Sequence, residues 1–571
     1  MNRIQLKAPW LRHYGVVPHT LEYPDKSMFD MISETAAKYP SYDAYEFMNQ
    51  KTTFISFIKE VRICARAFRA LGIREGDKVT ICLPNLPQTV IAFYALNAIG
   101  AVATMVHPLS SEGEIAFFLK DSQSVAAICM DQFYAKFQSA RTQVHLPKLI
   151  VTGVKDALNL PLRVGYYLTQ GRKINKIAKD ADIIWWNDFL TMANTHFGPF
   201  TANAKGKDPA AILYSGGTTG TSKGILLSNL NFNALAMQTF AMGNCLSPGN
   251  SMLSVMPMFH GFGLGVCIHT ALFYGVKCIL VPRFNVKSYG ELLKKKRPNC
   301  IAGVPTLFEA ITRNPDMEGV DLSYLRGVFS GGDSLSVELK RKFDAFLVAH
   351  HASVPIREGY GTTECVTASC LTPYHNFREG SIGLPFPDTF YKIVSSGTTQ
   401  EVPYGETGEI CILGPTVMIE YINQPEETAN TLKTHEDGYI WLHTGDLGTM
   451  DEDGYVYFKQ RIKRMIITSG YNVYPSQLEN MLDACEHVQM SCVIGVKDPL
   501  KMQKVKAFVV LKDGVQPTQK VKDDIMAYAK MHIAKYAMPY AIEIRESLPK
   551  TLVGKIAYTV LEKEENEPTQ G

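Results

Sequence analysis

The sequence lacks the cysteine pairs and the charge excess that several protein classes require. Its twelve cysteines stand singly, and no two are spaced as C-x-x-C. This excludes a zinc ribbon and a thioredoxin-type site and argues against a dense disulfide framework. Lys and Arg total 58 against 55 for Asp and Glu, too even a balance for a nucleic-acid binder that neutralises phosphates. We therefore expect a protein of a reducing compartment with no nucleic-acid partner.

Uninterrupted membrane-spanning runs are also missing. The first ten residues contain no apolar stretch of signal-peptide length. Residues 89–106 and 261–281 approach the roughly 20 apolar residues of a span. Pro84 and Pro87 break the stretch without acidic or basic residues that contains the first run, Gly100 splits it, and Gly275 splits the second. Each is predicted to be a buried helix followed by a core strand. We expect a cytoplasmic protein.

The sequence does contain a regular alternation of helices and short apolar strands. Between about residues 30 and 300, helices such as 54–71 and 87–99 are followed by apolar strands such as 79–83 and 101–106. This rhythm predicts α/β layers around parallel sheets. With 46% hydrophobic and 20% charged residues, the chain can bury a large core.

The pattern changes after about Gly380. Short strands separated by Gly-Glu, Asp-Gly and Pro turns are typical of a small β-barrel or antiparallel module, and a compact α+β region follows from Met465. The predicted fold class is α/β. A large N-terminal α/β domain of several subdomains, with a small β-barrel, would span residues 1–462. A small, mobile α+β C-terminal domain would span 463–571.

One segment, 158–179, combines basic and apolar side chains. Its basic residues stand among Leu, Tyr and Ile and are Arg163, Arg172, Lys173, Lys176 and Lys179. Such a stretch can dock on an anionic lipid surface, which would place the protein peripherally on the inner face of the membrane. An ordinary solvated surface segment is the alternative, and the sequence leaves both open.

The most informative segment is 212–225, ILYSGGTTGTSKGI. Its glycines let successive backbone N–H groups point at phosphate oxygens, its hydroxyls add donors, and Lys223 supplies a positive charge. The segment is not a Walker A loop, because Gly follows Lys223, and it is not G-x-G-x-x-G. It predicts a phosphate-binding loop; taken alone, a flexible surface loop would be the alternative.

This loop resembles the phosphate-binding signature of the adenylate-forming superfamily, which includes acyl- and aryl-CoA synthetases, luciferases and peptide-synthetase adenylation domains. It departs from that pattern at Gly216, where Ser is common, and at Ser222, where Pro is common. Further stretches resemble family motifs in the family's order: SGGDSL at 330–335, EGYGTTE at 358–364, WLHTGD at 441–446, RIKRMI at 461–466 and LPKTLVGKI at 548–556. The resemblance covers about residues 30 to 561.

The resemblance implies an ATP site with Mg²⁺. Tyr360 would stack on the adenine, and Thr363 would form a hydrogen bond with the α-phosphate. Glu364 would ligate Mg²⁺, a hard cation that prefers oxygen ligands, and Asp446 and Arg461 would hold the ribose. The other implied nucleotide contacts are Ser215, Gly217, Thr218, Thr219, Gly220, Lys223, Gly332, Asp333, Gly361, Thr362 and Lys555.

The resemblance also implies catalytic roles. Lys555 would offset charge that builds up in the pentavalent transition state. The catalytic set would be Lys555, Lys223, Glu364 and Thr219. Lys463 would be the hinge about which the C-terminal domain turns, and the loop with Ser469 and Gly470 would line the tunnel for the CoA thiol. Tyr558 departs from the family, where Arg is frequent.

The stretch 256–265, MPMFHGFGLG, resembles the family's acyl-site entrance. His260 would lie near the substrate carboxylate or gate the pocket; a buried structural histidine is the alternative. Gly303 and Gly331, with Gly263 and Gly265, would leave a long apolar channel open. We therefore expect a medium- or long-chain fatty acid, with aryl, cinnamoyl-like and bile-acid-like carboxylates as alternatives.

The predicted function is an AMP-forming ligase that converts a carboxylic acid to acyl-AMP and transfers the acyl group to CoA. Its small-molecule partners would be the acid, ATP and CoA, with Mg²⁺ as cofactor. One alternative is a ligase that loads the phosphopantetheine of a carrier protein. Another is a non-catalytic nucleotide-binding protein, which the intact Lys223, Glu364, Asp446, Arg461 and Lys555 argue against. The sequence leaves the oligomeric state open.

Overall fold

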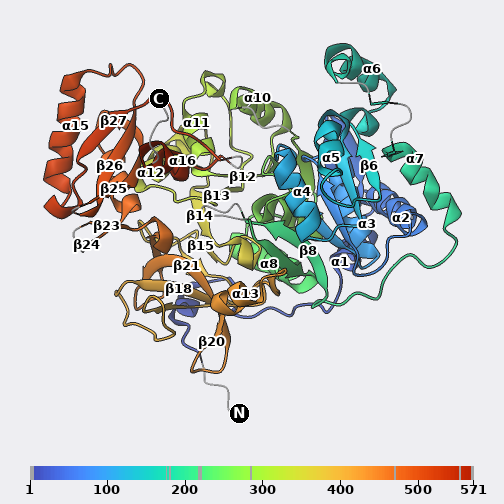
Figure 1. The fold of residues 1–571 in the computed structure, drawn as a ribbon, viewed down its shortest axis with the longest axis horizontal. Helices are drawn as coiled ribbons and strands as arrows, with labels where there is room; N and C mark the ends of the chain where they lie inside the picture. The colour runs from blue at the N-terminus through green and yellow to red at the C-terminus, as the bar shows by residue number, and fades with distance from the viewer. Residues whose placement is uncertain are drawn as a thin grey trace.

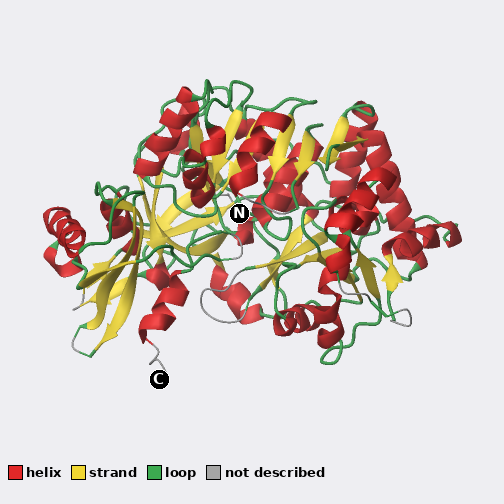
Figure 2. Ribbon diagram, turned by 90° about the horizontal axis from the view of Figure 1, so that it is seen from above, coloured by secondary structure: helices red, strands yellow, loops and turns green. Residues whose placement is uncertain are grey.

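The computed structural model describes residues 6–174, 177–178, 182–215, 222–282, 286–468, 471–499, 501–551 and 554–566. The α/β layers of the N-terminal half lie at one end of the molecule and the strands β25–β27 of the C-terminal part at the other (Figure 1). Seen from above, helices flank the strands on both sides (Figure 2). This is the layered α/β architecture that the sequence predicts.

Among the described residues, one sheet has eight strands in the order β19-β9-β8-β4-β3-β5-β6-β7, parallel from β8 to β7. All five residues of its strand β5 are buried, as expected for a strand covered on both faces. The strands are β3 (Lys78–Cys82), β4 (Val102–Met105), β5 (Ala126–Met130), β6 (Leu149–Thr152), β7 (Ile184–Trp185), β8 (Pro209–Tyr214), β9 (Gly224–Ser228) and β19 (Glu420–Tyr421).

A second sheet has nine strands in the described part of the chain, in the order β16-β15-β14-β13-β12-β10-β11-β1-β2. Its strands from β14 to β1 are parallel, so their carboxyl ends share one edge. The strands are β1 (Asp43–Phe47), β2 (Gln50–Thr53), β10 (Ser251–Ser254), β11 (Lys277–Leu280), β12 (Cys300–Gly303), β13 (Gly327–Ser330), β14 (Ile356–Tyr360), β15 (Cys370–Leu371) and β16 (Leu384–Pro385).

Polar caps fix where several helices begin. The side chains of Ser27, Thr53 and Ser111 accept hydrogen bonds from backbone N–H groups in the first turns of α1, α2 and α4, which satisfies donors that a helix leaves unpaired. The α-helices are α1 (Met28–Lys38), α2 (Phe54–Ala70), α3 (Pro87–Ala98), α4 (Glu112–Asp121), α5 (Tyr134–Ala140), α6 (Leu160–Thr169), α7 (Trp186–Thr191), α8 (Asn229–Gly243), α9 (Ala271–Phe273), α10 (Val286–Lys296), α11 (Pro305–Thr312), α12 (Val337–Ala349), α13 (Pro425–Thr431), α14 (Pro475–Asp483), α15 (Gln519–His532) and α16 (Tyr558–Asn566).

Both long apolar stretches are buried helices followed by core strands, as predicted. All twelve residues of α3 are buried, and β4 follows. The second stretch forms a buried π-helical segment, Phe262–Thr270, then α9 and β11. A helix that is apolar all round packs inside a core. Within the described ranges, no helix combines the length and apolarity that a membrane span needs.

The region after Gly380 forms the antiparallel module. Its described strands are ordered β17-β18-β21-β20, with β22 on β21, and are β17 (Phe390–Val394), β18 (Gly408–Leu413), β20 (Leu432–Thr434), β21 (Ile440–Met450) and β22 (Val456–Arg461). The C-terminal sheet is ordered β24-β23-β26-β25, with β27 on β26. Its strands are β23 (Ile466–Thr468), β24 (Tyr471–Val473), β25 (Val488–Asp498), β26 (Met502–Leu511) and β27 (Ala541–Ile544).

The hydrophobic side chains form separate cores on the two sides of residue 463. The largest core draws its buried residues from Trp10 to Val456, and another draws them from Ile466 to Ile542. Lys463 itself is exposed, in a short 3-10 turn, Ile462–Arg464, between β22 and β23. A domain boundary at 462/463 is compatible with this arrangement and stays a prediction.

Candidate active site

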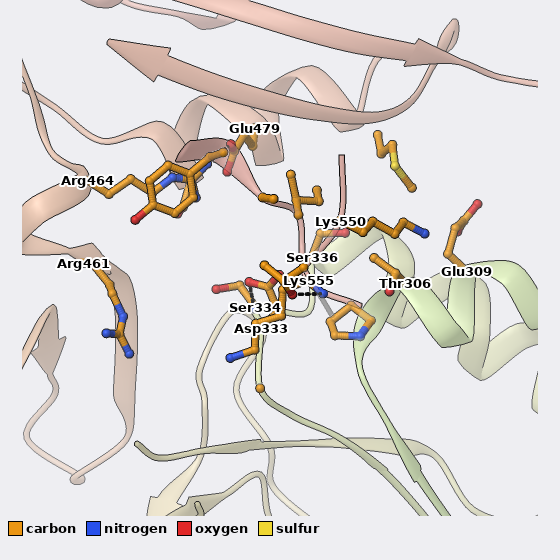
Figure 3. A pocket seen from close by; sticks show the side chains of 18 of the residues that line it. Thr306, Glu309, Asp333, Ser334, Ser336, Arg461, Arg464, Glu479, Lys550 and Lys555 are labelled. Carbon is orange, nitrogen blue, oxygen red and sulfur yellow. Dashed lines mark hydrogen bonds and ion pairs between the residues drawn. The ribbon is translucent and has the colours of Figure 1, made fainter. Parts of the chain in front are cut away.

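A cavity of about 1150 Å³ opens where the carboxyl ends of the parallel strands face the C-terminal part. Residues at or just after strand ends line it, among them Tyr214 and Ser215 of β8, Gly332 and Asp333 after β13, and Tyr360 of β14. The C-terminal part contributes Lys555 and Glu479 (Figure 3). Ligands of open α/β sheets bind at this edge, which makes the cavity the candidate active site.

Tyr360, Asp446 and Arg461 form one polar cluster on the cavity wall. The Tyr360 hydroxyl donates a hydrogen bond to Asp446 Oδ2 at 2.8 Å, and Arg461 Nε lies 3.2 Å from Asp446 Oδ1. Asp446 and Arg461 are direct neighbours across β21 and β22, so the sheet register creates the ion pair. Burial raises the pKa of the Asp446 carboxyl, and the charge of Arg461 opposes that shift.

Asp446 keeps acceptor capacity beside its ion pair. Its Oδ1 atom is buried and faces Arg461, but it accepts no hydrogen bond from any residue that the structure describes. A carboxylate oxygen accepts more than one hydrogen bond, so a ligand hydroxyl here would be stabilised. This fits the predicted contact with a ribose.

Lys555 reaches the same cavity from the C-terminal part. The Thr306 hydroxyl of α11 donates a hydrogen bond to the carbonyl of Gly554 at 2.9 Å, which ties the Lys555 loop to the larger part. Burial lowers the pKa of the Lys555 ammonium, Asp333 and Asp446 oppose that shift, and Arg461 adds to it. Figure 3 shows Lys555, Asp333 and Thr306 around one space.

His260 lies on the cavity wall in front of the π-helical segment. Its Nδ1 atom accepts a hydrogen bond from the backbone N–H of Phe262 at 3.2 Å. Burial and the nearby charge of Lys555 lower the pKa of His260 to about 3. The imidazole is therefore neutral at ordinary pH and can contact a carboxylate without adding charge.

Lys223 and Glu364 are joined through Tyr421, which the sequence analysis missed. The Tyr421 hydroxyl donates a hydrogen bond to Glu364 Oε1 at 2.7 Å, and Lys223 Nζ lies 4.7 Å from the centre of the Tyr421 ring. Lys223 also forms an ion pair with Glu427 of α13. No local pattern reveals these partners, because they depend on the antiparallel pairing of β19 with β9, which places Tyr421 opposite Ile225.

Glu364 lies at the cavity wall with a carboxylate that could ligate Mg²⁺. Its Oε1 is held by Tyr421, which fixes the orientation of the carboxylate. Carboxylate oxygens together with phosphate oxygens are the donor set that Mg²⁺ prefers. The residues present therefore fit the ion that the resemblance implies.

Several other predicted nucleotide contacts lie near this wall. Gly361 and Thr363 line the cavity; a Cβ on Gly361 would lie 2.2 Å from the carbonyl oxygen of Thr367, so only glycine fits. Thr362 is buried beside Cys365, to whose Sγ its backbone N–H donates. The Ser215 backbone N–H donates to the Lys223 carbonyl at 3.1 Å and closes the base of the phosphate loop. Gly217, Thr218, Thr219, Gly220, Ser469 and Gly470 lie outside the described residues.

The glycines expected to leave an acyl channel open lie close to their neighbours. A Cβ on Gly263 would lie 2.1 Å from the Pro257 carbonyl oxygen, and one on Gly303 would lie 2.2 Å from a methyl carbon of Leu307. Gly303 and Gly331 are not among the described residues that line the cavity. The acyl channel and the role of these glycines in it stay predictions.

Tyr558, where the family often has Arg, lies beside a partly buried ion pair of the C-terminal part. Its ring lies 4.7 Å from the Arg464 guanidinium. Arg464 pairs with Glu479, whose Oε1 also accepts the backbone N–H of Val493 at 2.8 Å. Arg464 and Glu479 line the cavity in Figure 3 and were missed in the sequence.

Solved structures define the fold. ATP-bound MatB from Rhodopseudomonas palustris superposes with a TM-score of 0.82 at 23% identity, covering 95% of this chain and 99% of that one. The anthranilate CoA ligase AuaEII in complex with anthranoyl-AMP gives 0.80 at 23% identity, covering 97% and 99%. At these identities the likeness shows that the chain shares the fold of these two proteins.

The sequence comparisons narrow the assignment. Residues 32–422 match the family model described as AMP-binding enzyme, and residues 477–555 match that of the AMP-binding enzyme C-terminal domain. The chain is 35% identical to the long-chain-fatty-acid–CoA ligase of Bacillus subtilis over 99% of both chains. It is 30% identical to that of Escherichia coli O6:H1 over 96% and 97%. The chain belongs to the AMP-binding enzyme family, and the predicted class, an AMP-forming acyl-CoA synthetase, is confirmed.

Proposed function

We propose that this enzyme activates a medium- or long-chain fatty acid as acyl-AMP and transfers the acyl group to CoA. The observation that carries the proposal is the convergence of Lys555 and the Asp446–Arg461 ion pair on one cavity. The choice of a medium- or long-chain fatty acid is supported by full-length similarity of the sequence to two long-chain-fatty-acid–CoA ligases. Aryl and related carboxylates, and a carrier-protein acceptor, are the alternatives.

The first half-reaction joins the acid to the α-phosphate. An oxygen of the carboxylate forms a bond to the α-phosphorus of ATP while the bond to pyrophosphate breaks. Lys555 and Lys223 offset the charge that develops on the phosphoryl oxygens, and Asp446 with Arg461 holds the ribose. When bound, Mg²⁺ at Glu364 neutralises phosphate charge. The neutral His260 contacts the carboxylate and leaves its negative charge available for attack.

The second half-reaction moves the acyl group to sulfur. The thiolate of CoA attacks the acyl carbon, and the bond from that carbon to the AMP oxygen breaks. Since Lys555 occupies the cavity beside the site of attack, residues 463–571 turn about Lys463 and withdraw it. The Thr306–Gly554 hydrogen bond opens in this motion. The resemblance implies that Ser469 and Gly470, which lie outside the described residues, would line the thiol path.

The test is AMP formation from ATP and CoA with palmitate, octanoate, acetate, benzoate and an amino acid in parallel. The proposal expects CoA-dependent turnover that is strongest with palmitate or octanoate. Preference for benzoate would overturn the fatty-acid assignment. Pyrophosphate release without thioester would instead indicate a carrier-protein acceptor.

We also propose that α6 contacts an anionic membrane surface from the cytoplasmic side. No residue of α6 is buried, and Leu160, Val164 and Leu168, four residues apart, are each more than half exposed. They lie on one helix face, and the helix projects at the edge of the molecule (Figure 1). Arg172 and Lys173 follow at its end and complement acidic lipid headgroups.

Co-sedimentation with vesicles tests this contact. Wild-type protein should bind vesicles rich in phosphatidylglycerol more than phosphatidylcholine vesicles, and Val164→Gln with Leu168→Gln should weaken that binding. Val348→Gln, at another strongly exposed valine, is the matched control and should not. Equal binding of wild type and the double variant would overturn the proposal.

A further inference from the structure

Three side chains that bind metals well meet inside the antiparallel module, and none of the three lines the cavity. Cys411 of β18 and His443 of β21 are direct partners in antiparallel register, so their side chains lie on the same face of the sheet. His435 follows β20, in the hairpin that leads to β21, where its backbone N–H donates to the Tyr439 carbonyl at 3.0 Å. All three residues are buried, with at most 6% of their surface exposed.

The distances match a small ion site. One ligand atom from each of Cys411, His435 and His443 lies within 4.8 Å of the other two, and the two Nε2 atoms are 2.9 Å apart. With Zn–S near 2.3 Å and Zn–N near 2.0 Å, a tetrahedral zinc site separates its donors by roughly 3–4 Å. Small side-chain shifts therefore suffice to bring the three donors into coordination range.

Glu409 orients one of the histidines toward the cluster. His443 Nδ1 lies 2.8 Å from Glu409 Oε2, and Glu409 Oε1 accepts the backbone N–H of Gly445 at 2.9 Å. With the carboxylate as acceptor, the His443 proton resides on Nδ1, and the Nε2 lone pair faces His435. Metal-binding histidines typically donate their other N–H to a carboxylate in this way.

The histidine pair is largely shielded from solvent, and His435 is free to change its tautomer. His435 is only 4% exposed, and its Nε2 atom lies 2.9 Å from that of His443. Its Nδ1 atom has no hydrogen-bond partner in the described part of the chain. No described neighbour therefore fixes the proton on either ring nitrogen, and Nε2 of His435 can become a ligand.

We propose that Cys411, His435 and His443 bind one zinc ion, with Glu409 as the outer partner of His443. On binding, the Cys411 thiol releases its proton, and the His435 proton moves from Nε2 to Nδ1, so that sulfur and two Nε2 atoms coordinate the ion. A water molecule completes a four-coordinate site. The ion links β18, β21 and the β20–β21 hairpin, whose strands are labelled in the lower part of Figure 1.

The experiment is a Co²⁺ titration of the full-length, chelator-treated protein without nucleotide. Cobalt replaces zinc in such sites and reports its ligands in absorption spectra. We expect one equivalent to give intense tetrahedral ligand-field bands and a thiolate-to-cobalt charge-transfer band, and Zn²⁺ to abolish both. Zn²⁺ should also raise the melting temperature of the wild-type protein.

Variants assign the ligands. Cys411→Ser should lose the charge-transfer band, and His435→Gln should weaken cobalt binding at least tenfold. Cys129→Ser, at a buried cysteine of another sheet, and Glu364→Gln, at the predicted magnesium ligand, should keep the wild-type spectrum. Where a ligand variant fails to fold by circular dichroism, the wild-type spectrum decides. Absence of the thiolate band in wild type, or its retention in folded Cys411→Ser, would overturn the proposal.

Discussion

The two walls of the active-site cavity are built differently. On the larger part, Tyr360, Asp446 and Arg461 are held by a hydrogen bond, an ion pair and a sheet register. Across the cavity, the Lys555 loop is tied to that part by the Thr306–Gly554 hydrogen bond, and an exposed ion pair joins Arg313 to Asp513. One wall is preorganised for a nucleotide, whereas the other is attached by contacts that are individually weak. This asymmetry suits an enzyme that must remove one catalytic group between two half-reactions.

Replacing Lys555 should separate the two half-reactions most clearly. Lys555→Ala should reduce acyl-AMP formation roughly 10²–10³-fold, the typical cost of removing one group that stabilises developing charge. Thioester formation from supplied acyl-AMP should persist. Lys550→Ala, on the same cavity wall, is the control and should lower adenylation far less. Equal loss of both half-reactions in Lys555→Ala would refute the assignment of Lys555 to the first step alone.

The preorganised wall includes an ionisable group that opposes stability at high pH. Glu358 of β14 is buried, which raises its pKa to about 8, although the Leu335 backbone N–H donates to it at 2.9 Å. The folded protein therefore binds the proton of the Glu358 carboxyl more tightly than the unfolded chain does. For this reason the contribution of Glu358 to the free energy of unfolding falls as the pH rises from about 4.5 to about 8. At pH 5, the free energy of unfolding of Glu358→Gln should match that of the wild-type protein.

Above pH 8, the free energy of unfolding of Glu358→Gln should exceed that of wild type by about 2–3 kcal/mol. This difference is smaller than the free energy that corresponds to the full pKa shift, because the site borders the cavity. Denaturant melts at pH 5 and pH 9 measure the difference. A variant less stable than wild type at pH 9 would show that Glu358 is ionised and paired there.

The ribose contact can be tested with nucleotides that lack hydroxyls. Asp446→Asn should raise the KM for ATP about tenfold or more, since a charged acceptor is lost, with a smaller change in kcat. Wild type should discriminate strongly against 2′,3′-dideoxy-ATP, and the variant should not. If Asp446→Asn kept the full preference for ATP, Asp446 would not hold the ribose.

The fold could be predicted further from the sequence than the site could. Alternation of apolar strands and helices depends on local periodicity, so the predicted helix 87–99 and strand 79–83 agree nearly to the residue with α3 and β3. The partners of the site depend on long-range pairing. Tyr421 approaches Glu364 only because β19 pairs with β9, and no spacing in the sequence encodes this.

The acyl pocket shows the opposite limit. Glycine at 263 and 303 has two possible meanings, an open channel or a close approach of neighbouring atoms. Their types and spacing are the same in both cases. The structure places Pro257 and Leu307 next to these glycines, and such neighbours are what composition and motif spacing leave out. The acyl channel itself stays a prediction.

The smallest predicted effect tests the weakly attached wall directly. Thr306→Val keeps the shape of the side chain but removes the hydroxyl that donates to the Gly554 carbonyl. The arrangement with Lys555 in the cavity should lose about 1 kcal/mol of stability, so its population should fall by up to about fivefold. Adenylation should fall by no more than that factor, and thioester formation from supplied acyl-AMP should not fall. The Thr312 hydroxyl donates a hydrogen bond to the Glu309 carbonyl within the same helix. Thr312→Val therefore controls for the substitution. A fall in thioester formation with Thr306→Val would mean that this contact supports both half-reactions, and the two walls would then not differ in the way that the hydrogen bonds indicate.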